Sequence, residues 1–193
     1  MRSPLRNPLR LGLVAAALLF GVPVTAAYVM GSRLPAEQEA RAAIRLRQGP
    51  MPVWSLLTRW SDQPEWRSDV AAFTALEPIG DAPAFRLVSP DGDETEVGVI
   101  AFVPPRSFAL RVEGEHFSGT QTVELVKDGL GTAVIVSKRG EIANPLTRLM
   151  ADRTGGLETG VEEFLVDLAG ALGDKPELVK DAAEVASLRA ASD

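Results

Sequence analysis

Short runs of alternating apolar and polar residues occupy the middle of the chain. In one of them Phe108, Leu110 and Val112 alternate with Arg111 and Glu113, which is the two-residue period of a strand with one buried face. Such runs, separated by turn residues, predict seven strands, over residues 40–47, 70–76, 84–88, 94–103, 107–113, 119–126 and 132–140. Because the turns between the last six are short, we expect an antiparallel meander.

A helical pattern follows these strands, over residues 144–172. Its apolar residues recur at steps of three and four, and they are Leu157, Val161, Phe164, Leu165, Leu168 and Leu172. The Gly155-Gly156 pair could interrupt this helix near its start. Pro52 and Ser61 are the expected starts of two short helices between the first and second strands.

This order of elements predicts the fold class. One antiparallel sheet cannot leave its apolar face in water, and the helix over 144–172 carries an apolar stripe long enough to cover that face. We therefore expect an α+β domain over residues 40–173, in which a curved antiparallel sheet of about seven strands grips a long C-terminal helix. Residues 174–193 form an alanine-rich, acidic tail, which we expect to be a short helix or a frayed end.

An uncharged, mostly apolar run precedes the domain. It covers residues 11–30, and a run of roughly 20 residues can cross a bilayer as a helix. We therefore divide the first part of the chain into a basic segment (1–10), a transmembrane anchor (11–31) and a linker (32–39). The run is expected to form one continuous helix that stands apart from the domain.

The arginines before the run predict its orientation. Arg2, Arg6 and Arg10 lie on the short N-terminal side, so that side is expected in the cytoplasm and the domain outside it. A cleaved signal peptide remains the alternative, because Thr25-Ala26-Ala27 supplies small residues for a cleavage site. In that case the domain would be secreted or periplasmic.

Charge and composition exclude several classes of function. Residues 33–193 carry 17 of the 20 basic side chains and all 26 acidic ones, for a net charge of −9. Such a domain repels phosphate backbones, so nucleic acid is not an expected partner. The chain has no cysteine, which removes disulfides, thiolate metal sites and a cysteine nucleophile.

Three groups of residues resemble one known superfamily. They are Met51-Pro52-Val53-Trp54-Ser55-Leu56-Leu57 with Trp60, Pro64, Glu65 and Trp66; Gly131-Thr132; and Gly140-Glu141-Ile142-Ala143-Asn144-Pro145-Leu146. In this order and spacing they resemble bacterial members of the SRPBCC superfamily, which includes START domains and polyketide cyclases. The resemblance covers roughly residues 40–173. It implies a helix-grip fold with an apolar cavity, hydrophobic or lipid ligands, and no universal catalytic motif.

The expected cavity lies between the sheet and the long helix. Aromatic residues make up 6% of the chain, so few large side chains are available to fill that space. We predict an apolar pocket of about 300–1,000 Å³, the usual range of ligand sites. The predicted ligand-binding residues that line it are Phe102, Phe108, Leu110, Val161 and Leu165.

Other polar groups have an ordinary structural interpretation. His116, the only histidine, is expected in a solvated turn rather than as a general base. The Asp91–Glu94 segment faintly resembles a calcium loop, but an Asp-Gly hairpin turn fits it better. Arg86, Arg111 and Glu113 are expected on the solvent face of the sheet, although an inward-facing Arg–Glu pair would mark a site.

These observations favour a membrane-tethered binding module for an apolar small molecule or lipid, without catalytic residues, metal or cofactor. An enzyme of the cyclase or hydratase type, using polar groups of the cavity, is one alternative. A structural or interaction domain with a filled core is the other. The oligomeric state cannot be read from the sequence.

Overall fold

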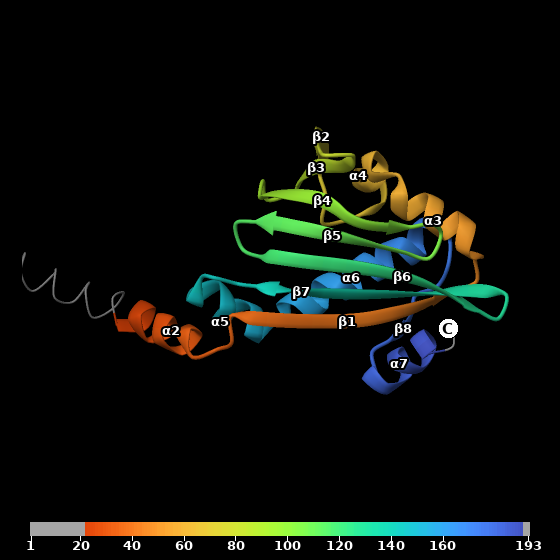
Figure 1. The fold of residues 1–193 in the computed structure, drawn as a ribbon. Coiled ribbons are helices and arrows are strands. Elements are labelled where there is room, and N and C mark those ends of the chain that lie inside the picture. Colours follow the sequence, from red (N-terminus) through yellow and green to blue (C-terminus); the bar gives the residue numbers. More distant parts are fainter. Residues whose placement is uncertain (1–21, 191–193) are drawn as a thin grey trace, which may run out of the picture.

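The computed structural model describes residues 22–190, and these form one curved sheet with helices packed on it (Figure 1). The helices are α2 (Val22–Ser32), α3 (Pro50–Thr58), the short 3₁₀ helix η2 (Trp60–Asp62), α4 (Gln63–Trp66), α5 (Pro145–Thr154), α6 (Gly156–Ala171) and α7 (Ala182–Ala190). The strands are β1 (Glu37–Leu46), β2 (Ala72–Ile79), β3 (Ala82–Val88), β4 (Glu94–Val103), β5 (Ser107–Gly114), β6 (Ser118–Asp128), β7 (Gly131–Glu141) and β8 (Glu177–Val179).

The sheet has eight strands in the order β2-β3-β4-β5-β6-β7-β1-β8, and every neighbouring pair is antiparallel. All seven predicted strands are present, and β2 to β7 form the expected meander. The first strand begins at Glu37, inside the segment predicted as a linker. The α+β class and the large antiparallel sheet are thus confirmed.

The two faces of the sheet carry different cores. The inner face packs against α6, and Val134, Val136 and Ile44 lie there with Leu165 and Leu168 of the helix, all buried. The alternate residues of the same strands point outward. A smaller core forms on the outer face under α7, and it consists of Ala43, Val126, Ala133, Ile135, Val179, Val185 and Leu188.

In the C-terminal part, the interruption considered at Gly155-Gly156 is present, and one further element was not expected. The helix over 144–172 is two helices, because Gly155 adopts a left-handed conformation with φ of 69° that ends α5 and starts α6. The described part of the tail contains the short helix that was expected, α7, and a strand that was not. Its Glu177–Val179 segment adds β8 to the free edge of β1, and α7 then covers the outer face, which the period-two pattern of the strands did not reveal.

The N-terminal segment is described only from residue 22 onward. The predicted anchor at 11–31 lies largely outside the described residues, and so does the basic segment 1–10. Residues 22–32 are helical, as expected, but α2 does not stand apart from the domain. It contacts α5, and Gly31 approaches Pro145 so closely that a Cβ atom there would lie 1.8 Å from the Pro145 carbonyl oxygen.

Within residues 22–190, no helix is both long enough and apolar enough to cross a bilayer. Arg148 of α5 fixes the short connection between α2 and the sheet. Its guanidinium donates to the carbonyl oxygens of Leu34 and Ala143, at 3.0 and 3.1 Å. The first of these hydrogen bonds ties the connection between α2 and β1 to α5.

Candidate functional site

A cavity of about 270 Å³ lies on the inner face of the sheet, beside the segment that follows α4. Its apolar wall consists of Val70, Phe85, Leu87, Val97, Leu110, Val112 and Phe117. Its polar lining includes Gln63, Arg67, Asp69, Ser89, Asp93, Thr95, Glu115, His116, Gln121 and Lys138. We call this space the inner cavity.

The inner cavity opens at the end of the sheet to which α2 and α5 are attached. β1 begins and β7 ends there, since Glu37 pairs with Glu141, and Ser118 at the start of β6 pairs with the same residue. The pairing of Thr95 with Gly114 places the β3–β4 and β5–β6 turns at this end as well. Both turns contribute exposed residues to the cavity lining, so the mouth of the cavity lies here.

Arg67 is held in one position by three neighbours. Its Nε and one terminal nitrogen donate to the two carboxylate oxygens of Asp69, at 2.9 and 2.6 Å. The other terminal nitrogen donates to Gln63 Oε1 at 2.8 Å, and the guanidinium lies 5.3 Å from the centre of the Phe164 ring. Burial alone would raise the pKa of Asp69, but the hydrogen bonds and charge of Arg67 hold it below the ordinary value.

The segment around Arg67 is also fixed to α6. The backbone N–H and the hydroxyl of Ser68 both donate to Asp167 Oδ2, each at 2.7 Å. Two charge-assisted hydrogen bonds to one carboxylate restrain this otherwise irregular segment. Arg67 therefore presents its charge to the cavity from a rigid support.

Lys138 is the second cation of the inner cavity, and its surroundings differ from those of Arg67. Its half-buried ammonium nitrogen lies 4.7 Å from the centre of the Phe117 ring. Among residues 22–190 its ammonium has neither a hydrogen-bond acceptor nor an ion-pair partner. Burial, followed by the nearby charge of Arg67, lowers the pKa of Lys138, while Asp69 acts in the opposite direction.

Glycines make room for the aromatic neighbour of Lys138. A Cβ atom on Gly140 would lie 2.7 Å from Phe117 Cζ and 2.3 Å from the Ser118 carbonyl oxygen. Gly119 is equally restricted, because its Cβ would lie 2.2 Å from the Arg139 carbonyl oxygen. The paired glycines let the two strands and the Phe117 ring come together beside the cavity mouth.

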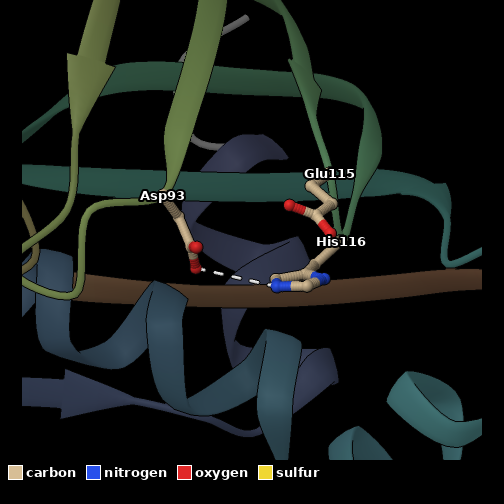
Figure 2. A group of neighbouring side chains, drawn as sticks. All are labelled: Asp93, Glu115 and His116. Carbon is tan, nitrogen blue, oxygen red and sulfur yellow. Dashed lines mark ion pairs between the residues drawn. The ribbon is translucent and has the colours of Figure 1, made fainter.

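Three titratable residues form a rim cluster at this mouth (Figure 2). Asp93 comes from the β3–β4 turn, whereas Glu115 and His116 come from the β5–β6 turn, and Asp93 Oδ2 lies 3.7 Å from His116 Nε2. One potential ligand atom from each of the three residues lies within 4.8 Å of the others. All three are exposed, and exposed acidic groups commonly come together without an ion, so we assign no metal to the rim cluster.

The five predicted ligand-binding residues have three different locations. Leu110 lines the inner cavity. Phe108, Val161 and Leu165 are buried in the main core. Phe102 is 49% exposed and borders a separate open groove of about 470 Å³, with Trp60, Asp81, Ala82, Pro83, Val99, Ile100 and Ala101.

The aromatic side chains account for this distribution. Aromatic residues are few, but several of them lie close together at the end of the sheet next to α3. Trp54 lies 5.2 Å from Phe102 and 5.8 Å from Phe108 between ring centres, and Trp60 lies 5.1 Å from Phe108 and 5.5 Å from Phe85. The inner cavity, at about 270 Å³, is slightly smaller than the predicted range, and its mouth lies at the opposite end of the sheet from the rings of Trp54 and Phe102.

The remaining polar candidates are where the sequence placed them. Arg86 pairs on the sheet surface with Glu94 and Glu96, at 3.1 and 2.8 Å, while Arg111 and Glu113 are exposed. The Asp91–Glu94 segment is a turn closed by the Ser89 N–H, which donates to the Asp93 carbonyl oxygen at 2.9 Å. His116 is in an exposed turn, as expected.

Sequence reasoning did not identify Gln63, Arg67, Asp69, Gln121 or Lys138. A signal was present for Lys138, because the two-residue period of its strand places it on the same face as Val134 and Val136. No comparable signal existed for Arg67. It lies in an irregular segment whose position becomes clear only when α4 and α6 pack together.

Comparisons with known proteins place the fold. No protein-family model matches the chain, and no curated protein sequence resembles it significantly. Solved structures, in contrast, match the chain in fold. A START superfamily protein from Mycobacterium smegmatis is 15% identical with a TM-score of 0.53, covering 67% of this chain and 98% of that one.

Two further structures have the same arrangement. An aromatase/cyclase from Streptomyces, named Zhui, is 12% identical with a TM-score of 0.60, covering 70% of this chain and 93% of its own. A protein from Thermus thermophilus is 17% identical with a TM-score of 0.59, covering 68% of this chain and 94% of that one. At these identities the similarity concerns the fold.

Proposed function

Because the chain has an SRPBCC-like helix-grip fold, we propose that it is a binding module that holds a small, largely apolar molecule in the inner cavity. The single observation that carries this proposal is the cavity itself. Its wall on β4 and β5, with Val97, Leu110 and Val112, is apolar, and polar groups such as Arg67, Gln121 and Lys138 line the same space. That combination is the usual construction of a small-molecule site.

The solved structures support the same class of function. They include a protein described as a START superfamily member and one described as an aromatase/cyclase. At about 270 Å³ the inner cavity is near the lower end of the range usual for ligand sites, about 300–1,000 Å³. The ligand of this chain is therefore small.

We further propose that the apolar run at 11–30 tethers the module to a membrane, with the domain outside the cytoplasm. The mouth of the inner cavity and α2 lie at the same end of the sheet. A tether at this end would keep the mouth close to the bilayer surface. A ligand that partitions into lipid could then enter the cavity without crossing bulk water.

A cyclase or hydratase activity is the second candidate. The observation that favours it is the pair of inward-facing cations, Arg67 and Lys138, because ionisable groups in a cleft can polarise or deprotonate a substrate. Turnover of a polyketide-like substrate by the purified protein, lost in Lys138→Met, would support this activity.

The binding proposal is tested by identifying what the protein carries. The full chain is purified from its own host and extracted with organic solvent, and mass spectrometry of the extract is compared between wild type and Val112→Trp. The larger side chain should fill the cavity and remove the co-purified molecule. Val103→Trp is the matched control, since Val103 is 52% exposed and does not line the cavity.

Thermal melts first establish that both variants fold. A molecule present in wild type and in Val103→Trp, and missing from folded Val112→Trp, supports the proposal. An extract that contains no stoichiometric small molecule, or the same molecule in all three proteins, contradicts binding in this cavity.

A further inference from the structure

We infer that the ligand of the inner cavity is an anionic amphiphile, a short- or medium-chain carboxylic acid whose carboxylate lies between Lys138 and Arg67. This inference rests on the proposed function and adds the chemical class of the ligand. Its starting point is a charge that the protein itself does not neutralise. The Lys138 ammonium faces the cavity, contacts the Phe117 ring at 4.7 Å, and has no hydrogen-bond or ion-pair partner among residues 22–190.

Removing an ammonium from water without a partner is unfavourable. Lysine side chains at a protein surface usually extend into solvent instead. Lys138 lies on the inner face of β7 because the two-residue period of the strand, set by Val134 and Val136, directs it there. In the free protein water can still reach this half-buried group, and a bound anion would supply the acceptor that residues 22–190 do not.

Arg67 provides the second half of the site. Its hydrogen bonds to Asp69 and Gln63 occupy three of its five N–H groups. The other two have no hydrogen-bond partner among residues 22–190, and the packing on Phe164 holds the guanidinium in place. A carboxylate could therefore accept from Lys138 and from Arg67 together, as charge-assisted hydrogen bonds.

The other charged groups of the cavity do not cancel this preference. Asp69 is already engaged by Arg67 through both of its oxygens. Asp93, Glu115 and His116 form the exposed rim cluster, where solvent and salt screen their charges. Lys138 and Arg67 lie deeper, with only 14% of the Arg67 side chain exposed, and their attraction is screened less.

The apolar wall determines the rest of the ligand. Phe85, Val97, Leu110 and Val112 line the same cavity from β3, β4 and β5, and Leu110 is in register with Lys138 through Gln121. An alkyl or aryl group attached to the carboxylate would lie against this wall and remove apolar surface from water. A phosphate or a bare inorganic anion would leave the wall empty, and a neutral lipid would leave Lys138 without a partner.

The test compares two probes that differ in charge and hardly in shape, octanoate and octanamide. Their binding to the full chain, reconstituted in nanodiscs of zwitterionic lipid, is measured by titration calorimetry near neutral pH. We expect octanoate to bind at least about tenfold more tightly than octanamide. In Lys138→Met that preference should fall at least about tenfold, and Lys138→Arg should retain part of it.

Lys175→Met is the matched control, because Lys175 is exposed and does not line the cavity. It should bind both probes as wild type does. Equal affinity of wild type for octanoate and octanamide would overturn the anionic ligand and leave the binding module intact. Failure of both probes to bind would overturn the proposed function with it.

Discussion

At Lys138 the folded protein would be more stable without a charge, whereas the proposed binding of an anion requires one. Its ammonium is half-buried, and burial lowers its pKa, so the charged form is held at a cost to the folded state. Residues that reduce stability without a structural role are commonly retained for function. The stability of variants at this position therefore separates a structural lysine from a ligand-binding one.

Lys138→Met should leave the free energy of unfolding near neutral pH unchanged, or raise it by up to about 1 kcal/mol. Methionine fills a similar volume and keeps a favourable contact with Phe117 through its sulfur. Urea denaturation of wild type and variant measures the difference. A loss of more than about 1 kcal/mol would show that the ammonium makes a structural interaction and would weaken the functional interpretation.

The difference in free energy of unfolding between wild type and Lys138→Met should depend on pH. The pKa of Lys138 is lowered in the folded protein from its ordinary value of 10.5. At pH values between the folded and the unfolded pKa, the unfolded chain therefore binds more protons than the folded one. The contribution of Lys138 to stability therefore increases as pH rises through that interval. The stability advantage of Lys138→Met should shrink over the same interval.

Gly119 shows how strand pairing constrains single residues. A Cβ atom there would meet the Arg139 carbonyl oxygen at 2.2 Å, and the nearest atoms are all backbone atoms of β7, so no flexible side chain could move aside. We expect Gly119→Ala to lower the free energy of unfolding by about 1–3 kcal/mol. Gly160→Ala, at a site with open space around it, is the control and should be neutral or stabilising when both are compared by urea denaturation.

At the scale of elements, α6 provides the helical side of the main core, against the inner face of the sheet. Phe164 is buried, and its ring lies 5.5 Å from the Trp66 ring and beneath Arg67. Phe164→Ala should cost about 3–5 kcal/mol, from lost transfer energy and the cavity left behind. A loss below about 1 kcal/mol in denaturant melts would mean that this face of α6 does not carry the core.

A carboxylate joins the end of α6 to the end of β1. Asp174 accepts from the Arg47 backbone N–H at 3.0 Å and from Arg47 Nε at 2.6 Å. The hydrogen bond from the Arg47 side chain is the main reason that the pKa of Asp174 is below its ordinary value of 3.8. Its contribution to stability is thus present above that value and is lost as pH falls through the lower pKa of the folded state.

Asp174→Asn should therefore reduce the free energy of unfolding near neutral pH by about 1–2 kcal/mol, since Arg47 is exposed and solvent screens part of the interaction. Urea melts at a series of pH values test this. The difference between wild type and variant should shrink as the solution is acidified below the ordinary aspartate pKa. A difference that stays constant into strong acid would exclude an ionic contribution from Asp174.

The sequence predicted regular elements better than it predicted the site. Alternation in the strands and the three- and four-residue steps of Leu157 to Leu168 report directly on which face is buried, so the sheet and α6 could be anticipated. The position of a void is not encoded locally. It depends on how side chains from separate elements pack together, as Trp54, Trp60 and Phe108 do.

At the scale of the whole molecule, the cavity mouth, α2 and α5 share one end of the sheet. The uncharged run at 11–30, which lies mostly outside the described residues, is proposed to anchor this end to a membrane. After carbonate extraction of cells that express the full chain, the protein should remain in the membrane pellet. Release into the soluble fraction, with a new N-terminus near Tyr28, would establish a cleaved signal peptide instead.

The central claim, that a ligand occupies the inner cavity, is tested most directly by photo-crosslinking. A medium-chain fatty acid bearing a terminal diazirine is irradiated with the full chain, and the labelled peptides are mapped by mass spectrometry. The account predicts labelling of the apolar wall, at residues 85–87, Val97 and residues 110–112, lost in Val112→Trp and retained in Val103→Trp. Labelling confined to the groove beside Phe102, or unchanged in Val112→Trp, would contradict it.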